Sequence, residues 1–298
     1  MRELKRQGYE NTMSDGGDLT EATQVAEFFS RHRPEYVFMV AGKSGGISAN
    51  QKYPADLMLD NLLVETNVMR SAHRYGVRKM LYLASACSYP KHASQPMRVD
   101  SLMTGALEPT NEAYAVAKLA GVVLCKAFRQ QYEANFIAGV PANAFGPGDD
   151  FTPEDSHVVA ALIRRIDDAK TARTPTVEVW GTGAARREFI FVDDLANACV
   201  FVMNHYDGAE PINIGGGEDL SIKELATIIR EVIGYNGQLQ FDTSKPDGMP
   251  LKSLDSGVLR QMGWEPANSF SEGLRITYDW FLNNRDERKP DLELAHVR

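Results

Sequence analysis

Apolar runs alternate with amphipathic segments along the first half of the chain. Short apolar runs predict strands, and apolar residues recurring every three or four positions predict helices between them. We expect strands at 36–42, 79–85 and 135–143, and helices near 57–75 and 112–132. The apolar runs lack strict polar alternation, which is typical of strands covered by helices on both faces. The pattern predicts an α/β fold with a Rossmann-like, doubly wound parallel sheet.

The pattern changes after residue 145, where turn-forming residues gather. Strand-like and helical segments continue beyond it, among them the helix-like run SIKELATIIREVIG at 221–234. We therefore expect two unequal domains and a tail. The boundaries are 1–145 plus about 188–215 for the Rossmann-like domain, about 146–187 plus 216–284 for a smaller C-terminal α/β domain, and 285–298 for a charged tail.

Composition narrows the class of protein. With 43% hydrophobic and 24% charged residues, the chain is typical of a globular protein. Its apolar runs are shorter than the roughly 20 residues of a membrane span, and no secretory signal is recognisable, so we expect a cytoplasmic protein without a membrane partner. A net charge of −8 argues against nucleic acid as the main partner. The three cysteines share no CxxC spacing and fit a reducing compartment, and we assign no residue to a metal.

The start of the chain lacks one feature of a dinucleotide-binding sheet. Such a sheet opens with a strand that runs into a glycine-rich turn, where a helix N-terminus holds the pyrophosphate. Here residues 2–11 have the pattern of the end of a first helix, and we expect neither Gly16-Gly17 nor Gly45-Gly46 to lie between a strand and a helix at the required spacing. The first strand is therefore expected to be missing, through a start placed too far downstream or through truncation. A truncated chain should bind a dinucleotide poorly.

Tyr114 and Lys118 form a Y-x-x-x-K pair, which on a helix places both side chains on one face. A buried ammonium beside a phenol favours the phenolate, so we expect Lys118 to lower the pKa of Tyr114 toward neutrality. Ser85 ends the predicted strand at 79–85, at the edge where such sheets bind ligands, and its hydroxyl can hold the same carbonyl oxygen. The pair alone is also common on helices without any function. The three residues together predict a carbonyl reductase.

Six segments resemble the GDP-L-fucose synthase family, a branch of the extended short-chain dehydrogenase/reductases. They are GGISANQKYPADLMLDN, SACSYPKHASQPM, LEPTNEAYAVAKLAG, PANAFGPGDDFTPEDSHVVAALIRR, VWGTGAARREFIFVDD and FDTSKPDGMPLKSLD, and the similarity extends from about Asp18 to Asn284. The resemblance implies GDP-4-keto-6-deoxy-D-mannose as substrate, NADP (NADPH) as cofactor, 3,5-epimerisation and 4-reduction. By analogy with the fold, it also implies a homodimer through the helices near 57–75 and 112–132.

The resemblance implies two sets of catalytic residues. Ser85, Tyr114 and Lys118 form the reductase triad, and Cys87 and His157 form the acid/base pair for epimerisation. The chemistry is consistent, because C3 and C5 both lie beside the C4 ketone, and one polarised carbonyl can acidify both C–H bonds. Cys87 is two residues beyond Ser85, and a histidine can move protons near neutral pH. Without the resemblance, Cys87 would be read as a buried core residue and His157 as a cap of the following helix.

The resemblance also implies binding residues. For the cofactor they are Asp18, Leu19, Ala41, Tyr114, Lys118, Pro141, Asn143 and His157, and for the substrate Asn143, Arg165, Trp180, Arg187 and Lys252. Arginine can grip a pyrophosphate with two hydrogen bonds, and tryptophan can flank a flat base. Two alternatives stay open. Arg187 can instead form a surface ion pair with Asp193 or Asp194, and Arg164 rather than Arg165 can face the substrate.

The chain departs from the family pattern at few positions. Ala86 stands where a second serine is usual and Ser88 where a bulkier apolar residue is usual, and neither change removes a catalytic group. The loop at 11–19 contains no arginine, which weakens the preference for NADP over NAD. Two other functions remain open: an epimerase or reductase for another NDP-4-keto sugar, and a truncated non-catalytic paralogue that binds a nucleotide sugar or serves as a dimer partner.

Overall fold

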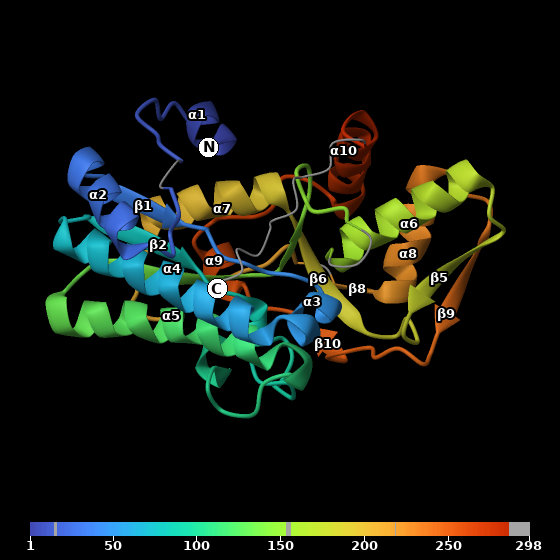
Figure 1. Cartoon of the computed structure of the whole chain (residues 1–298), viewed down its shortest axis with the longest axis horizontal. Coiled ribbons are helices and arrows are strands. Elements are labelled where there is room, and N and C mark those ends of the chain that lie inside the picture. Colours follow the sequence, from blue (N-terminus) through green and yellow to red (C-terminus); the bar gives the residue numbers. More distant parts are fainter. Residues whose placement is uncertain (15–16, 153–155, 218, 286–298) are drawn as a thin grey trace.

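A parallel sheet of four strands forms the centre of the first lobe, in the order β1–β2–β3–β7 (Figure 1). The computed structural model describes residues 1–14, 17–152, 156–217 and 219–285. The strands are β1 Tyr36–Met39, β2 Lys79–Leu83, β3 Phe136–Pro141 and β7 Ile212–Ile214. β2 lies between β1 and β3 and is almost wholly buried, as a strand covered on both faces should be. The predicted Rossmann-like α/β fold is confirmed.

Helices cover both faces of this sheet. Two long helices, α4 and α5, pack against each other on one face, α2 packs on α4, and α7 covers the other face (Figure 1). The short helix α1 lies on α7, where Arg2 pairs with Asp193 at 2.8 Å and the Asn197 amide donates to Glu3 at 2.9 Å. The bounds are α1 Arg2–Arg6, α2 Ala22–His32, α4 Pro54–Arg74, α5 Glu112–Tyr132 and α7 Val192–His205. Residues 2–6 are therefore helical, as predicted for this segment.

The second lobe contains two small sheets and three helices. In one sheet β6 pairs with β4, β8 and β10, and in the other β5 pairs with β9. The strands are β4 Asn143–Phe145, β5 Thr176–Trp180, β6 Arg186–Phe191, β8 Asp219–Ser221, β9 Gln238–Asp242 and β10 Leu251–Lys252. The helices are α6 Val158–Ala172, α8 Ile222–Ile233 and α10 Phe270–Asn283. Both α8 and α10 begin with a capping box, at Ser221 and Ser269.

Each lobe has its own hydrophobic core, but the chain crosses between them. One cluster surrounds β2 and β3, and the other lies between α6, α8, α10 and β6. Met249 and Leu254, on either side of β10, and Trp264 pack in the first cluster. Leu254 also forms a parallel bridge with Met97, and Met97 N–H donates to the Ser253 carbonyl at 2.8 Å. β10 is thereby held beside the carboxyl end of the first sheet, next to the short helix α9 (Gly257–Gln261).

One expectation about a strand was wrong in detail. The apolar run at 135–143 is not one strand, because β3 ends at Pro141, which has no N–H to donate, and β4 begins at Asn143 in the other lobe. Gly45-Gly46 directly precedes the short helix α3 (Ile47–Lys52) but does not directly follow β1, which ends at Met39. The Asn50 amide fixes this short helix by donating to the carbonyls of both glycines, at 2.9 and 3.0 Å.

No helix among the described residues is long and apolar enough to cross a membrane. Residues 286–298, which make up nearly all of the predicted tail, lie outside the described part of the chain.

Candidate active site

Ser85 and Cys87 follow the central strand β2 and lie together at the carboxyl end of the sheet. Ser85 caps a single 3₁₀ turn, η1 (Ala86–Ser88), and its Oγ accepts a hydrogen bond from Cys87 N at 3.2 Å. This turn keeps the hydroxyl and the thiol side by side. The structure thus places Ser85 at the end of a central parallel strand, as the sequence predicted, and brings Cys87 to the same edge.

Tyr114 and Lys118 lie one turn apart near the start of α5, which packs on η1. The Tyr114 hydroxyl shares a hydrogen bond with the Ser85 side chain. Lys118 lies deeper and is 5% exposed. Its ammonium pairs with the carboxylate of Glu65, on α4, at 3.3 Å. The structure therefore brings Ser85 and Tyr114 into direct contact. The Lys118 ammonium is directed toward Glu65 on α4.

The predicted lowering of the Tyr114 pKa is wrong for this structure. Burial raises the pKa of Tyr114, and the charge of the neighbouring Cys87 raises it further, against the hydrogen bond with Ser85. Burial is the main physical reason, and the charge of Lys118, which pairs with Glu65, does not offset it; the charge of Glu65 adds a smaller upward shift to the pKa of Tyr114. Tyr114 consequently keeps its proton near neutral pH and is a proton donor rather than a phenolate.

Cys87 is held by two nitrogen donors. Lys252 Nζ lies 3.1 Å from its sulfur, and Asn111 Nδ2 lies 3.2 Å away. Burial alone would raise the pKa of the Cys87 thiol, but the charge of Lys252, hydrogen bonds with Ser85 and Lys252, and the charge of Arg187 together bring that pKa below its usual value. Cys87 thus has the thiolate character that a base needs.

The other two cysteines behave in the opposite way. Both Cys125 and Cys199 are buried, and burial raises the pKa of each, for Cys199 to about 12. The default reading of a cysteine as core residue therefore applies to these two, and Cys87 stands apart from them.

Strand pairing brings the cations to the thiol. β10 pairs with β6 in parallel, with Lys252 opposite Arg187. Arg187 is mostly buried and donates to the carbonyls of Arg186 at 2.8 Å and Asp247 at 3.1 Å. The alternative of a surface ion pair is wrong, because Asp193 pairs with Arg2 and Asp194 accepts from the backbone N–H of Ala267 at 3.0 Å.

The remaining substrate residues gather in and beside the second lobe. The Arg165 guanidinium lies over the ring of Trp180, 5.2 Å from its centre, and the Lys245 ammonium lies 5.3 Å from it. Arg164 instead pairs with Asp168 at 2.8 Å. Of the two arginines left open by the sequence, the one at the exposed tryptophan is Arg165. Asn143 is anchored on β6, where its amide donates to the Glu188 carbonyl at 2.8 Å.

His157 is exposed at the N-terminus of α6. It occupies the capping position, but its side chain makes no capping hydrogen bond, so a simple cap is not its role. Residues 153–155, just before it, lie outside the described part of the chain. No contact between His157 and Ser85, Cys87 or Tyr114 is recorded among the described residues, and its role in epimerisation stays a prediction.

The predicted cofactor residues line the ends of β1 and β3 and the start of α2. Asp18 accepts from the N–H and hydroxyl of Thr20, at 2.9 and 2.7 Å, and the Leu19 carbonyl accepts from Asn67 at 3.1 Å. Ala41 lies in the loop after β1, and Pro141 ends β3.

The loop after β1 packs closely against Asn61 and Lys118 at Gly42. A Cβ built on Gly42 would come within 2.6 Å of Asn61 Oδ1 and 3.3 Å of Lys118 Nζ. Asn61 Oδ1 is buried and has no hydrogen-bond partner within the described residues. The close approach of the loop to these two side chains therefore requires a glycine at residue 42.

Sequence reasoning did not single out Asn111, Glu65 or Asn61. Asn111 stands three residues before Tyr114, and only the fold shows that its amide reaches the Cys87 sulfur. Glu65 and Asn61 lie on the buried face of α4, and polar residues at apolar positions of a helix are the one signal that could have marked them.

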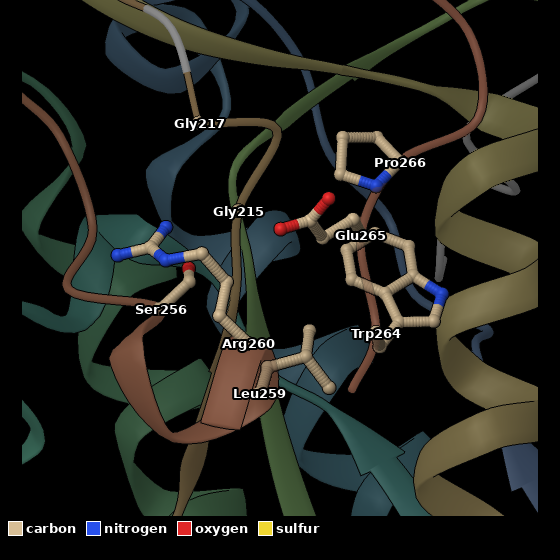
Figure 2. Close-up of a pocket in the computed structure, with 8 residues that line it drawn as sticks. All are labelled: Gly215, Gly217, Ser256, Leu259, Arg260, Trp264, Glu265 and Pro266. Carbon is tan, nitrogen blue, oxygen red and sulfur yellow. The ribbon is translucent and has the colours of Figure 1, made fainter. Parts of the chain in front are cut away.

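A further hollow lies beyond the end of β7. Its volume is about 230 Å³, and Figure 2 shows the Arg260 and Glu265 side chains on either side of it. Its lining is Gly215, Gly217, Ser256, Leu259, Arg260, Trp264, Glu265 and Pro266. None of the predicted site residues belongs to it, so the candidate site is separate from this hollow.

Comparison with known proteins identifies the family and the relatives of this chain. The pattern that defines the NAD dependent epimerase/dehydratase family matches residues 3–215. GDP-L-fucose synthase 1 of Arabidopsis thaliana is 48% identical over 287 residues, which cover 95% of this chain and 89% of that protein. Among solved structures, a GDP-6-OMe-4-keto-L-xylo-heptose reductase from C. jejuni has a TM-score of 0.89 and 30% identity, covering 95% of this chain and 93% of its own.

A GDP-L-fucose synthetase from Naegleria fowleri, solved with NADP bound, has a TM-score of 0.86 and 26% identity. The match covers 96% of this chain and 90% of that one.

Replacing Lys252 by methionine should make Cys87 less reactive. Without the ammonium the pKa of Cys87 rises, so the rate of alkylation by iodoacetamide at pH 7 should fall several-fold. The difference should vanish at high pH, where both thiols are ionised. Peptide mass spectrometry would locate the adduct, and Lys126→Met, on the surface of α5, is the matched control. Equal rates at pH 7 for Lys252→Met and the unaltered chain would contradict this role of Lys252.

Proposed function

Because the chain belongs to the NAD dependent epimerase/dehydratase family, and within it to the GDP-L-fucose synthases, we propose that it converts GDP-4-keto-6-deoxy-D-mannose to GDP-L-fucose. It inverts C3 and C5 and then reduces the C4 ketone with NADPH. One observation carries the proposal: the thiol of Cys87, gripped by Lys252 and Asn111, lies beside Ser85 and Tyr114. A reductase alone needs no such base, whereas an epimerase acting at the same ketone does.

The epimerisation begins at Cys87. Its thiolate takes the proton from C3, and the electron pair of that C–H bond moves into the C4 carbonyl to form an enolate. The enolate oxygen lies at the hydroxyls of Ser85 and Tyr114, which donate to it. His157 returns a proton to the opposite face of the carbon, and exchange with solvent restores both groups. The same cycle at C5 completes the second inversion.

The residues around Lys118 fit the nicotinamide end of NADP. Gly42 lies close to Asn61 and Lys118, the unpartnered Asn61 Oδ1 offers an acceptor for a ribose hydroxyl, and the Lys118 ammonium offers a donor. When bound, NADPH supplies the hydride that reduces C4. The chain supplies the proton: Tyr114, whose raised pKa keeps it protonated, gives its proton to the C4 oxygen while Ser85 holds that oxygen.

The nucleotide half of the substrate lies toward the second lobe in this proposal. Arg165 and Lys245 bring two positive charges to Trp180, which is 40% exposed. This arrangement suits a pyrophosphate attached to a flat base, which the ring can stack against. Asn143 on β4 and Arg187 on β6 lie on paired strands, and in this proposal the sugar binds beside them. A different GDP-4-keto sugar is the main alternative, because the heptose reductase shares the fold.

A homodimer is the second part of the proposal. α4 and α5 pack side by side, and each turns apolar side chains outward: Leu59 and Leu63 on α4, and Val116 and Val123 on α5. Each of these is at least 36% exposed. Two such helix pairs can bury each other around a two-fold axis. The cytoplasm is the proposed compartment, since the three cysteines are free thiols.

The purified chain should oxidise NADPH in the presence of GDP-4-keto-6-deoxy-D-mannose and release GDP-L-fucose, which chromatography against a standard would identify. Cys87→Ser should lower the turnover at least about 100-fold through loss of the base. Cys199→Ala, which changes a buried cysteine of α7, should retain activity. If the chain oxidises NADPH only with a different keto sugar, that sugar is its substrate. If it binds the nucleotide sugar without turnover, the non-catalytic alternative is favoured.

Light scattering on the protein as it elutes from a size-exclusion column should give twice the chain mass for the unaltered chain. The Val123→Lys variant should give the mass of a single chain. The added ammonium would face its own copy across the two-fold axis in an apolar environment, which is unfavourable. Val258→Lys, at an exposed position on α9, is the control and should remain dimeric. A single chain mass for the unaltered protein at micromolar concentration would rule out this interface.

A further inference from the structure

A carboxylate is buried beneath the candidate site. Glu65, on α4, is 1% exposed. Its Oε1 accepts hydrogen bonds from the Tyr82 hydroxyl at 2.5 Å and from Lys118 Nζ at 3.3 Å. Its Oε2 is buried and has no hydrogen-bond partner within the described residues. The carboxylate thus joins the central strand, which carries Tyr82, to the helix that carries Tyr114 and Lys118.

Tyr82 is fixed so that it can hold this carboxylate. Its ring lies against α5 at Gly121, where an added Cβ would come within 2.4 Å of the Tyr82 hydroxyl oxygen. The Lys118 ammonium lies over the same ring, 4.8 Å from its centre. Glu65 is therefore held from one side by Tyr82 and contacts Lys118 on the other, and glycine at 121 makes this packing possible.

Stability does not explain such a pair. Removing two charges from water costs several kcal/mol per ion, and apolar residues of similar volume are often as stable or more stable in such places. Both partners here are nearly inaccessible, with Lys118 at 5% and Glu65 at 1% exposure. The pair lies directly below Tyr114, which is one turn from Lys118 on the same helix. A role in the chemistry of Tyr114 explains its position better than a role in folding.

The charges in this cluster act on each other. Burial lowers the pKa of Lys118, and Glu65 opposes that change. Burial raises the pKa of Glu65, and the charge of Lys118 and the hydrogen bond from Tyr82 oppose it. The charge of Glu65 also raises the pKa of Tyr114. The titratable groups that face this pair are Tyr82 on β2, Tyr114 and Cys125 on α5, and, through Tyr114, Cys87 on η1.

We propose that Glu65 is a positioning residue for the reduction: its buried carboxylate keeps Lys118 charged and in place, and its negative charge separately helps to keep the proton on Tyr114 until the ketone oxygen takes it. The reaction named here rests on the proposed function, whereas the effect of Glu65 on Lys118 does not. Removing the charge of Glu65 lowers the pKa of both Lys118 and Tyr114, because a carboxylate favours the protonated form of each neighbour.

The direct test is the titration of the Lys118 side chain, which needs neither substrate nor cofactor. In protein labelled with ¹³C-lysine, the Lys118 Cε signal is assigned by its loss in Lys118→Met and followed against pH by NMR. In Glu65→Gln the midpoint should fall by about one pH unit or more. Glu35→Gln, which removes an equal charge from the exposed pair with Arg78, is the matched control and should leave the midpoint unchanged.

An unchanged Lys118 midpoint in Glu65→Gln would overturn the proposal. If that variant does not fold, Glu65→Asp keeps the charge at a greater distance, and its midpoint should lie below that of the unaltered chain. An unchanged midpoint in a folded Glu65→Asp would then overturn the proposal.

The second readout is the pH dependence of turnover. The alkaline limb of kcat should move to lower pH in Glu65→Gln, since the groups that must stay protonated there have lower pKa values. If kcat is smaller in Glu65→Gln but its alkaline limb lies at the same pH as in the unaltered chain, the role of Glu65 is merely structural and the proposal is contradicted. If the unaltered chain does not reduce the GDP-keto sugar, the proposed function fails while the NMR titration still decides the role of Glu65.

Discussion

A half-buried thiol, a half-buried phenol and a buried ammonium lie together at the carboxyl end of β2, and each charge that forms among them needs a partner. Ions removed from water are costly unless an opposite charge or a hydrogen bond compensates them. Lys252 provides that partner for Cys87, and Glu65 provides it for Lys118. The first pairing requires β10 to return from the second lobe, and the second requires α4 to pack along α5. The crossing of β10 between the lobes and the packing of α4 along α5 thus both supply charged partners to this one site.

These pairings also separate the roles of groups that lie close together. Cys87 has a lowered pKa and can take a proton, whereas Tyr114 has a raised pKa and can give one. The difference arises from the partner of each group, because both are half-buried. One ketone oxygen held at Ser85 and Tyr114 then serves two inversions and one reduction. Because both reactions use the same ketone oxygen, the epimerase base Cys87 follows the reductase serine Ser85 by only two residues.

The sequence predicted the local elements well and the long-range partners poorly. The helix at 112–132 has the predicted bounds, and the strand predicted at 79–85 is present as Lys79–Leu83 with Ser85 just beyond its end, because both elements follow from local apolar patterns. The contact of Lys252 with Cys87 joins residues 165 positions apart and depends on β10 crossing between lobes. The pKa of Tyr114 was predicted in the wrong direction because burial raises it, and because Lys118 pairs with Glu65 on a different helix. No local pattern contains that information.

The central claim is that one site at the end of β2 both removes the protons beside the ketone and reduces it. The most direct test is hydrogen exchange in D₂O without NADPH, followed by NMR of GDP-4-keto-6-deoxy-D-mannose. The account predicts that the chain incorporates deuterium at C3 and C5, and that Cys87→Ser abolishes this exchange. Exchange that persists in Cys87→Ser, or its absence in the unaltered chain, would contradict the account.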